Sequence, residues 1–344
     1  MQPSTLSKLA AAVTPALAFL LTACLGQTQT FTIREVEPLV LPGIADSNSP
    51  MHWNDKGNLV VFQSDGMPIR MEGPSLGALG EVRAVRFYSY DNVPLWLEAT
   101  WKAPNGAIYG WYHHEIFLNC PALPLSMPVI GALVSYDDGK TFFDLGIVMR
   151  PAHNPNCNAQ NGYFGGGHGD FTVIPDREAK YLYFVFSNYG GPAEQQGIAL
   201  ARMEASAVDF PQGAVFKYFQ GDWNSPGLGG EVSPVFGVST SWDDLNTNAL
   251  WGPSIHYNEY LNKYVVIMSH ACCSPGWPPQ GFFLSFAEDL ARPETWAQPQ
   301  FALDYLGWYP MIVGLDPGST DKHSGKRARI FTSSLSAWEI EFER

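Results

Sequence analysis

Residues Gly169–Gly190 read GDFTVIPDREAKYLYFVFSNYG, which is two apolar runs separated by a short polar segment. The runs FTVI and YLYFVF consist mainly of aromatic and β-branched residues, and such residues favour strands. The segment between them contains Pro175 and Asp176, which favour a reversal of the chain. The stretch therefore predicts an antiparallel hairpin whose second strand is strongly apolar.

Four other parts of the chain repeat this order of strand, turn and apolar strand. They are SPMHW-NDKG-NLVVFQS (49–64), WLEATW-KAPNG-AIYGWYHHE (96–115), GPSIHY-NEYLN-KYVVIMSHA (252–271) and YPMIVGL to ARIFTSS (309–334). Further strands are expected at 130–136, 197–204, 281–287 and 337–343. Five spaced units of antiparallel strands predict an all-β, five-bladed β-propeller over residues 39–344, with an irregular β-sandwich as the alternative. Residues 24–38 are expected to form an anchor and linker that also supplies a ring-closing outer strand.

The segment Ser135–Phe142, SYDDGKTF, matches the Asp-box pattern S-x-D-x-G-x-T-[WF]. In this pattern a carboxylate binds turn amides, glycine takes an open backbone conformation and the aromatic ring packs under the turn. The motif predicts one Asp-box hairpin between outer strands of a blade. Its role is structural, so Asp137 and Asp138 are not expected in an active site.

The composition suits many turns and few helices, because the 344 residues include 33 glycines and 27 prolines. Only 15% of the residues are charged, and the net charge is -13. An acidic chain is repelled by phosphate backbones, so we expect no nucleic-acid partner. A neutral or basic ligand is the simpler expectation.

The N-terminus resembles a bacterial lipoprotein signal. Lys8 precedes an apolar run from Leu9 to Leu21, which is too short to span a bilayer, and the run ends in Leu-Thr-Ala-Cys at Cys24. Residues 1–23 are therefore predicted to be a signal peptide, and Cys24 to be lipidated. Leu25 in place of aspartate favours the outer membrane. An exported protein anchored to the cell envelope by lipid alone is expected, and an ordinary secretory signal is the alternative.

Four more cysteines lie within the predicted propeller. Cys120 follows one strand and Cys157 precedes another, so we pair them in a disulfide, which export would permit. The adjacent Cys272 and Cys273 form either a vicinal bridge or two thiols. No C-x-x-C pair is present, so we expect no structural zinc. We expect no cofactor; a central Ca²⁺ would suit the fold, but no ligand spacing identifies one.

Candidate site residues open the first strand of each predicted blade, because these strands line the channel of a propeller. Asp170 is the first candidate for a catalytic carboxyl group, followed by Glu115 and Asp46 and then by Glu98. His113 is noted with its neighbours in the segment Tyr112–Glu115 as a residue near the mouth of the channel, without a catalytic or substrate-binding role. The side chains expected to contact substrate are Asn48, His52, Trp53, Trp111, Tyr112, His114, His168, Trp251, His256, Trp308 and Tyr309. For the tryptophans, packing between blades is the alternative, and for Glu98 it is a buried carboxylate bound by backbone amides.

The blade pattern resembles that of the five-bladed glycosidases of glycoside hydrolase families 43 and 117, and of propellers catalogued as domain of unknown function 4185. The resemblance covers most of residues 46–344. It rests on DSNSPMHW (46–53), GDFTVIPD with YLYFVFS (169–187), WGPSIHYNEYLNKYVVIMS (251–269), and FFLSFAEDL followed by TWAQP (282–299). The resemblance implies hydrolysis of a glycosidic bond, with His114 or His168 tuning a carboxyl group or acting as the acid. The chain departs from the family 43 pattern at Ser49, where that pattern has an aspartate before proline.

Three functions remain open from the sequence. The first is a glycosidase acting on an oligo- or polysaccharide, since such an enzyme needs two carboxyl groups across the scissile bond. The second is a polysaccharide lyase that uses Tyr112 or His114 as base, which requires an arginine such as Arg70, Arg83 or Arg86 in the funnel. The third is a non-catalytic propeller that binds a glycan or a protein.

Overall fold

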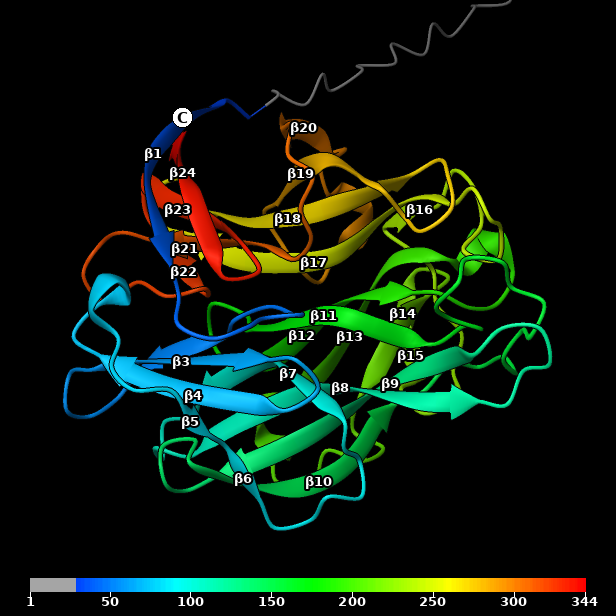
Figure 1. Ribbon diagram of the computed structural model, residues 1–344, viewed down its shortest axis with the longest axis horizontal. Helices are drawn as coiled ribbons and strands as arrows, with labels where there is room; N and C mark the ends of the chain where they lie inside the picture. Colours follow the sequence, from blue (N-terminus) through cyan, green and yellow to red (C-terminus); the bar gives the residue numbers. More distant parts are fainter. Residues whose placement is uncertain (1–28) are drawn as a thin grey trace, which may run out of the picture.

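The computed structural model describes residues 29–344, which form an all-β chain of five mainly antiparallel sheets arranged as the blades of a propeller (Figure 1). The predicted fold class is confirmed. The predicted signal peptide and the lipidation site Cys24 lie outside the described residues. No helix among the described residues is long and apolar enough to cross a membrane.

Each blade is a short meander of neighbouring strands. Blade 1 contains β2 (Met51–Trp53), β3 (Leu59–Ser64), β4 (Pro68–Gly73) and β5 (Arg83–Ala84). Blade 2 contains β7 (Leu95–Lys102), β8 (Ile108–Leu118), β9 (Leu125–Ser135), β10 (Thr141–Met149) and β6 (Arg86–Phe87). Blade 3 contains β11 (His168–Pro175), β12 (Tyr181–Asn188), β13 (Gly197–Glu204), β14 (Phe216–Phe219), β15 (Asp222–Pro226) and β16 (Phe236–Gly237).

The other two blades follow the same plan. Blade 4 contains β17 (Asn248–Asn258), β18 (Lys263–Cys272), β19 (Pro279–Ala287), β20 (Gln300–Leu303) and β22 (His323–Ser324). Blade 5 contains β21 (Pro310–Gly314), β23 (Arg327–Thr332), β24 (Leu335–Phe342) and β1 (Phe31–Val40). Short 3₁₀ helices lie at Leu76–Ala78, Ala193–Gln195, Ala205–Ala207 and Pro293–Thr295.

The strongly apolar strands are buried on both faces because each blade packs between two neighbours. In β12, Leu182–Asn188 are all buried. Phe184 on one face belongs to the core shared with blade 2, and Val185 on the other face belongs to the core shared with blade 4. This packing explains why the middle strands have continuous apolar runs, whereas a half-exposed strand would alternate apolar with polar residues.

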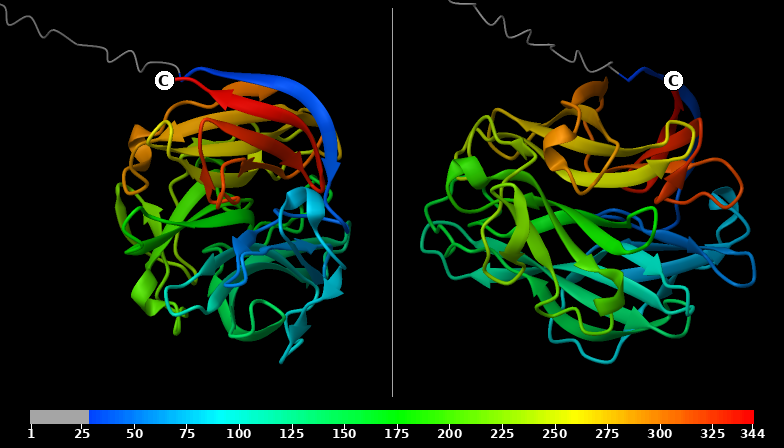
Figure 2. Two further views of the ribbon diagram at one scale, coloured as in Figure 1. Left: turned by 90° about the vertical axis from the view of Figure 1, so that its left-hand side faces the viewer. Right: turned by 180° about the vertical axis from the view of Figure 1, so that it is seen from behind.

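The ring is closed by the first strand of the chain. β1 pairs antiparallel with β24, with Phe31 opposite Phe342, and becomes the outermost strand of blade 5. Figure 2 shows the blue first strand beside the red last strand. β1 spans Phe31–Val40, so residues 31–38 of the predicted linker belong to the propeller.

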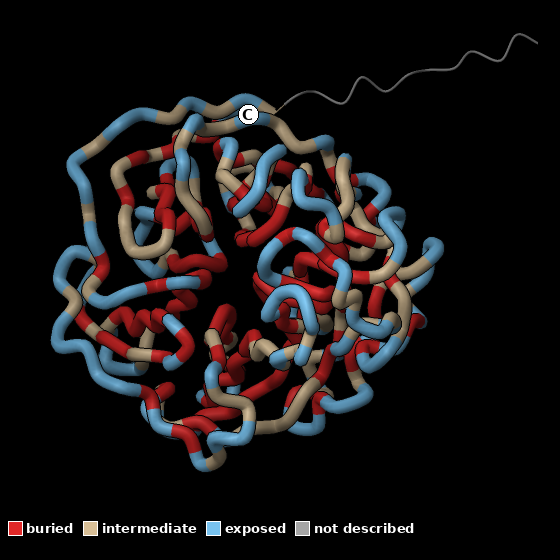
Figure 3. Tube along the Cα trace, turned by 45° about the vertical axis from the view of Figure 1, so that its right-hand side comes forward, coloured by how far each residue is buried: buried red, intermediate tan, exposed pale blue. Residues whose placement is uncertain are grey.

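Polar contacts between blades cross the centre of the ring. Asn48 Nδ2 donates to the carbonyl oxygens of Phe171 in blade 3, at 3.0 Å, and Pro253 in blade 4, at 3.2 Å. Lys322 Nζ lies 2.6 Å from Asp321 Oδ2 and 3.5 Å from Thr172 Oγ1. Figure 3 shows buried segments gathered toward this centre and exposed ones at the rim. Asn48 therefore connects three blades through hydrogen bonds. This structural role differs from the substrate contact that was predicted for it.

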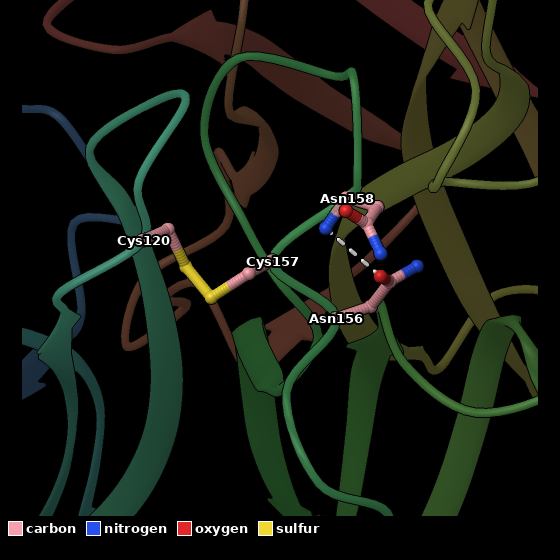
Figure 4. The surroundings of a disulfide bond; sticks show 4 residues. All are labelled: Cys120, Asn156, Cys157 and Asn158. Atoms are coloured by element: carbon pink, nitrogen blue, oxygen red, sulfur yellow. Dashed lines mark hydrogen bonds between the residues drawn. A yellow bond between two sulfur atoms is a disulfide. The ribbon is translucent and has the colours of Figure 1, made fainter.

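A disulfide joins Cys120 to Cys157, with Cα atoms 5.2 Å apart (Figure 4). It connects the loop after β8 to the loop that leads into β11, and it closes a loop with a sequence separation of 37. Such a cross-link stabilises chiefly by restricting the unfolded chain. Cys272 and Cys273 are also bonded to each other, which settles the alternative between a bridge and two thiols.

The turn between β9 and β10 is built as a hairpin cap. Asp137 Oδ1 accepts hydrogen bonds from the backbone N–H groups of Lys140, at 3.1 Å, and Thr141, at 2.8 Å. Gly139 has φ +75°, and the ring of Phe142 is fully buried. The carboxylate of Asp137 therefore serves the turn.

Candidate active site

Five titratable side chains meet at one end of the ring, where the first strands of the blades begin. We call them the acid cluster: Asp46 from the loop before β2, Glu98 in β7, His113 and Glu115 in β8, and Asp170 in β11. His113 and Glu115 share a face of β8 because side chains alternate along a strand. The structure thus brings together Asp46, Glu98, Glu115 and Asp170, the four carboxyl groups named as catalytic candidates from the sequence.

Asp170 lies at a β-bulge at the start of β11. The register of β11 and β12 shifts between Gly169 and Phe171, and Asp170 has φ +43°, which is uncommon for a residue with a side chain. Its carboxyl group is buried and accepts a hydrogen bond from the Tyr189 hydroxyl. Burial raises the pKa of Asp170 to about 7, and the charges of Glu98 and Glu115 add to this rise.

His113 lies between the carboxyl groups and links them. Its Nδ1 is 3.2 Å from Glu98 Oε1 and 3.9 Å from Asp170 Oδ1, and its Nε2 is 3.5 Å from Glu115 Oε1. Burial lowers the pKa of the ring, but the surrounding carboxylates outweigh burial and raise it to about 10. His113 is therefore a cation at neutral pH and offsets the negative charge of its neighbours.

Glu98 is the most deeply buried carboxyl group of the acid cluster. Its side chain is 1% exposed, and Oε2 accepts a hydrogen bond of 2.9 Å from the Phe171 backbone N–H group. Burial raises its pKa, and the hydrogen bond to His113 opposes that rise. These contacts match the alternative of a buried carboxylate bound by a backbone amide, so Glu98 positions His113 and the bulge and is not a group that reaches substrate.

Asp46 and Glu115 are the accessible carboxylates of the cluster. Asp46 is exposed, and partial burial together with the charge of Asp170 raises its pKa to about 6. The Glu115 side chain is 32% exposed and accepts a hydrogen bond of 2.7 Å from Ser126 Oγ. Burial would raise the pKa of Glu115, but the His113 cation lowers it below its usual value. Glu115 therefore stays ionised over the pH range in which Asp46 and Asp170 change protonation state.

Aromatic side chains surround the cluster on the side of blades 3 to 5. Burial and the charges of Asp170 and Asp46 raise the pKa of the Tyr309 hydroxyl, which indicates that Tyr309 lies close to the cluster. Trp308 is half-buried beside Trp251, at 5.5 Å between ring centroids. Trp251 itself is only 1% exposed, which leaves no indole face free for a sugar, and its predicted ligand contact is not supported.

Two residues of this region carry no signal in the sequence. Tyr189 follows the end of β12, where a tyrosine extends an apolar strand without any functional pattern. Trp277 lies in the loop after β18 and stacks at 5.9 Å on the Tyr189 ring. Only the folding of this loop over the end of blade 3 brings Trp277 near Asp170.

Trp111 and Tyr112 of β8 point into the cores between blades and correct the prediction of two sugar contacts. Trp111 is fully buried, with its ring 5.7 Å from Phe184 in blade 3. The Tyr112 hydroxyl binds Asp144 Oδ1 at 3.0 Å on the other side of the sheet. Both predictions fail for the same reason, since the two faces of a propeller blade pack against other blades.

His114 also lies on the wrong face for the predicted role. Its Nδ1 is 3.0 Å from the carbonyl oxygen of Pro94, on the side of β8 opposite to His113. His113 therefore lies among the carboxyl groups, in the place predicted for His114.

His52 and Trp53 lie at the opposite end of blade 1. His52 Nε2 is 2.9 Å from Oδ1 of Asp138, a residue of the hairpin cap, and Trp53 Nε1 donates to the carbonyl oxygen of Ser319 at 3.0 Å. β2 starts near the acid cluster and runs away from it, so these later residues of the strand cannot reach the site. Their predicted substrate contacts are wrong.

The other two histidines predicted to contact substrate, His168 and His256, are buried away from the acid cluster. His168 Nε2 is 3.0 Å from Lys217 Nζ, and burial next to this cation keeps its pKa well below the usual value. Burial and the neighbouring His323 lower the pKa of His256 to about 3. Both rings are neutral packing elements, which corrects their prediction as substrate contacts.

The acid cluster also contains a set of atoms with the geometry of metal ligands. One ligand atom each from Glu98, His113 and Asp170 lie within 4.8 Å of one another, and all three residues are buried. These three side chains could hold a cation, and they also contact one another, since His113 Nδ1 is 3.2 Å from Glu98 Oε1.

We expect Tyr189→Phe to raise the pKa of Asp170 above about 7, because the tyrosine hydroxyl donates a hydrogen bond that favours the ionised carboxylate. The carboxyl carbon of labelled aspartate reports this pKa in an NMR titration, whether or not the protein is active. Tyr163→Phe removes the hydroxyl of a tyrosine that contacts Trp277 at 4.8 Å between rings and serves as the matched control. An unchanged or lower Asp170 pKa in Tyr189→Phe contradicts the assignment.

Comparison with known proteins gives no match to a protein-family model and none to a curated protein sequence. Solved structures do match over nearly the whole chain. An endo-arabinase from Bacteroides thetaiotaomicron has a TM-score of 0.53 and 13% identity, with 90% of this chain and 98% of that chain covered. An α-L-arabinofuranosidase from Lactobacillus brevis has a TM-score of 0.51 and 11% identity, with 88% and 92% covered.

A thermostable family-43 glycoside hydrolase has a TM-score of 0.50 and 12% identity, with 88% of this chain and 92% of that chain covered. At these identities the likeness describes the backbone and not the side chains of a site. The chain therefore shares the five-bladed propeller fold of these glycoside hydrolases.

Proposed function

We propose that this protein is a glycoside hydrolase that works by carboxylic acid and base catalysis at the acid cluster. One observation carries the proposal: Asp46 and Asp170 come from different blades, meet at one end of the ring, and have pKa values raised to about 6 and about 7. Glycosidic hydrolysis requires one proton donor and one proton acceptor at the scissile bond. The glycosidase fold supports the same reaction class by analogy alone.

In the proposed reaction, Asp170 is the acid and Asp46 is the base. Asp170 gives its proton to the glycosidic oxygen as the bond from that oxygen to the anomeric carbon breaks. Asp46 takes a proton from the water whose oxygen forms the new bond to that carbon. One water is consumed for each bond broken, and both carboxyl groups regain their starting state by proton exchange with solvent.

The other members of the cluster prepare these two groups. The His113 cation limits the pKa of Asp170, which burial alone would raise further. Glu98 holds His113 from one side and Glu115 holds it from the other. The half-buried Trp308 and the Tyr309 ring suit a carbohydrate substrate, because the C–H faces of sugars pack on aromatic rings.

The pH dependence of kcat/KM is expected to be bell-shaped with a narrow maximum. Below about pH 6 the base Asp46 becomes protonated, and above about pH 7 the acid Asp170 loses its proton. Activity therefore falls on both sides of this window. Initial rates at low substrate concentration across the pH range measure both limbs, and a profile that keeps rising through pH 8 would exclude Asp170 as the acid.

The proposal is tested by assaying the protein against plant, algal and bacterial-wall polysaccharides. New reducing ends without formation of an unsaturated, ultraviolet-absorbing sugar support hydrolysis. Formation of the unsaturated product supports a lyase instead. The positions of the arginines weigh against the lyase, because Arg70 binds Asp138 and Arg83 pairs with Glu81, both away from the acid cluster.

A non-catalytic glycan-binding propeller is the second candidate, and the burial of the cluster favours it. Asp170 is 3% exposed and Tyr309 is 9% exposed, so a substrate must reach Asp170 past Asp46 and the aromatic side chains. Saturable binding of a polysaccharide without any release of reducing ends would support this candidate over the enzyme.

Export and lipid anchoring are part of the proposal and rest on the sequence from Lys8 to Cys24. The Cys120–Cys157 and Cys272–Cys273 disulfides support an oxidising compartment. We expect labelled palmitate to be incorporated into the protein in bacterial cells and to be lost in Cys24→Ala. A Cys24→Ala variant that keeps the label contradicts the assignment.

A further inference from the structure

The three arginines from which a lyase could take its positive group meet at a place away from the acid cluster. Arg70, Arg83 and Arg86, together with Lys140, line a surface hollow of about 390 Å³ between blades 1 and 2. Its other lining residues are Glu72, Glu81 and Ala84. The proposed glycosidase reaction uses none of these side chains.

The crossing from blade 1 to blade 2 brings the cations together. β5 pairs with β4 so that Arg83 lies directly opposite Arg70. Two residues later, the chain joins blade 2 as β6, where the Arg86 backbone N–H group donates to the Lys140 carbonyl oxygen at 3.0 Å. The segment Arg83–Phe87 therefore places Arg83 and Arg86 beside Arg70 of blade 1 and Lys140 of blade 2.

Positive charge exceeds negative charge in this hollow. Its four cations face the lining carboxylates of Glu72 and Glu81 and the adjacent carboxylate of Asp138, which leaves a surplus of one positive charge on a chain of net charge -13. Arg70 Nη2 is 2.6 Å from Glu72 Oε2 and 2.8 Å from Asp138 Oδ2, and Arg83 Nη2 is 3.3 Å from Glu81 Oε2. Arg86 and Lys140 have no carboxylate oxygen within 4.0 Å among residues 29–344. Since like charges directly across a strand pair destabilise a sheet, this arrangement gains from a bound anion.

We propose that the hollow is a binding site for an oxyanion, either free sulfate or the carboxylate of an acidic sugar. Arg70 is 5% exposed and is fixed by Asp138, to which it donates from Nε at 2.9 Å and from Nη2 at 2.8 Å. It therefore contributes ordered positive charge, and the exposed Arg83 and Arg86 supply the hydrogen-bond donors for a ligand. Guanidinium groups bind such anions through two parallel hydrogen bonds, and Lys140 adds a point charge. The site is independent of the proposed hydrolysis.

Isothermal titration of the intact protein tests this site with three probes: sodium sulfate, sodium glucuronate and neutral glucose. Sodium chloride at equal ionic strength is the reference for general screening. We expect saturable binding of one sulfate or glucuronate per chain and none of glucose. Binding of sulfate alone identifies a free-ion site, and binding of both identifies a site that also accepts a sugar carboxylate.

The double variant Arg83→Ala/Arg86→Ala is expected to weaken this binding by about 10-fold or more, since it removes two charge-assisted partners. Arg34→Ala/Lys263→Ala removes two cations from blades 4 and 5 and should bind like the unchanged protein. Asp170→Asn should also bind normally. No saturable binding of sulfate or glucuronate to the unchanged protein, or equal affinity in Arg83→Ala/Arg86→Ala, overturns the proposal.

Discussion

Replacing Asp170 with asparagine is expected to lower kcat by a factor of about 10² to 10⁴ on any polysaccharide that the protein cleaves, which is the usual contribution of a general acid. The amide cannot give a proton to the glycosidic oxygen. Its oxygen can still accept the Tyr189 hydrogen bond, so the local structure should survive. Reducing-end assays on the purified protein measure the loss, and thermal unfolding checks that the variant is folded.

Asp55→Asn is the matched control for this variant. Asp55 lies in the turn after β2, its side chain is 91% exposed, and its one ion pair is with Lys102 at the surface. We expect kcat within a factor of about two of the unchanged value, because exposed ion pairs contribute little. If Asp170→Asn keeps full activity while it remains folded, Asp170 is not the acid. A similar loss in both variants would point to a general effect of charge.

Trp111→Ala is expected to lower the free energy of unfolding by about 3–5 kcal/mol, the range for truncation of a large buried aromatic side chain. The indole is fully buried between blades 2 and 3 and packs edge-on against Phe184. Its removal leaves a cavity in the core that holds β8 against β12. Guanidinium chloride unfolding followed by far-ultraviolet circular dichroism measures the change.

Trp101→Ala provides the comparison, because Trp101 is only partly buried at the end of β7. Its loss of stability should be clearly smaller than that of Trp111→Ala. The conservative variant Trp111→Phe should recover part of the lost stability without altering carbohydrate binding. A Trp111→Ala protein of nearly unchanged stability but weakened carbohydrate binding would restore the interpretation of Trp111 as a sugar contact.

The sequence alone was enough to predict the blades. Strand propensity and turn residues are local properties, and their repetition along Met51–Thr332 leaves few architectures other than a propeller. The same reasoning placed Asp170 at the mouth of the ring, since it opens the first strand of a blade. Asp46 could be named as a candidate because it precedes the first strand of blade 1, although it is not at the position expected from family 43.

The choice between neighbouring side chains depended on the tertiary structure. His113 and His114 are adjacent in one strand, and the alternation of side chains guarantees that only one of them can face the acid cluster. Nothing local distinguishes the two faces, because both faces of a blade are covered by other blades. For the same reason the sequence could not tell that Trp111 and Trp251 fill the core rather than line the site.

The grouping of charges also depended on the tertiary structure. Local sequence patterns show that Arg70, Arg83 and Arg86 exist, but not that the crossing between two blades collects them with Lys140 in one hollow. The raised pKa values of Asp46 and Asp170 likewise come from burial and from carboxylates that are distant in the chain. Electrostatic interactions act through space, so the chemistry of this protein follows from which residues the ring brings together, whereas its strands follow from residues that are adjacent in sequence.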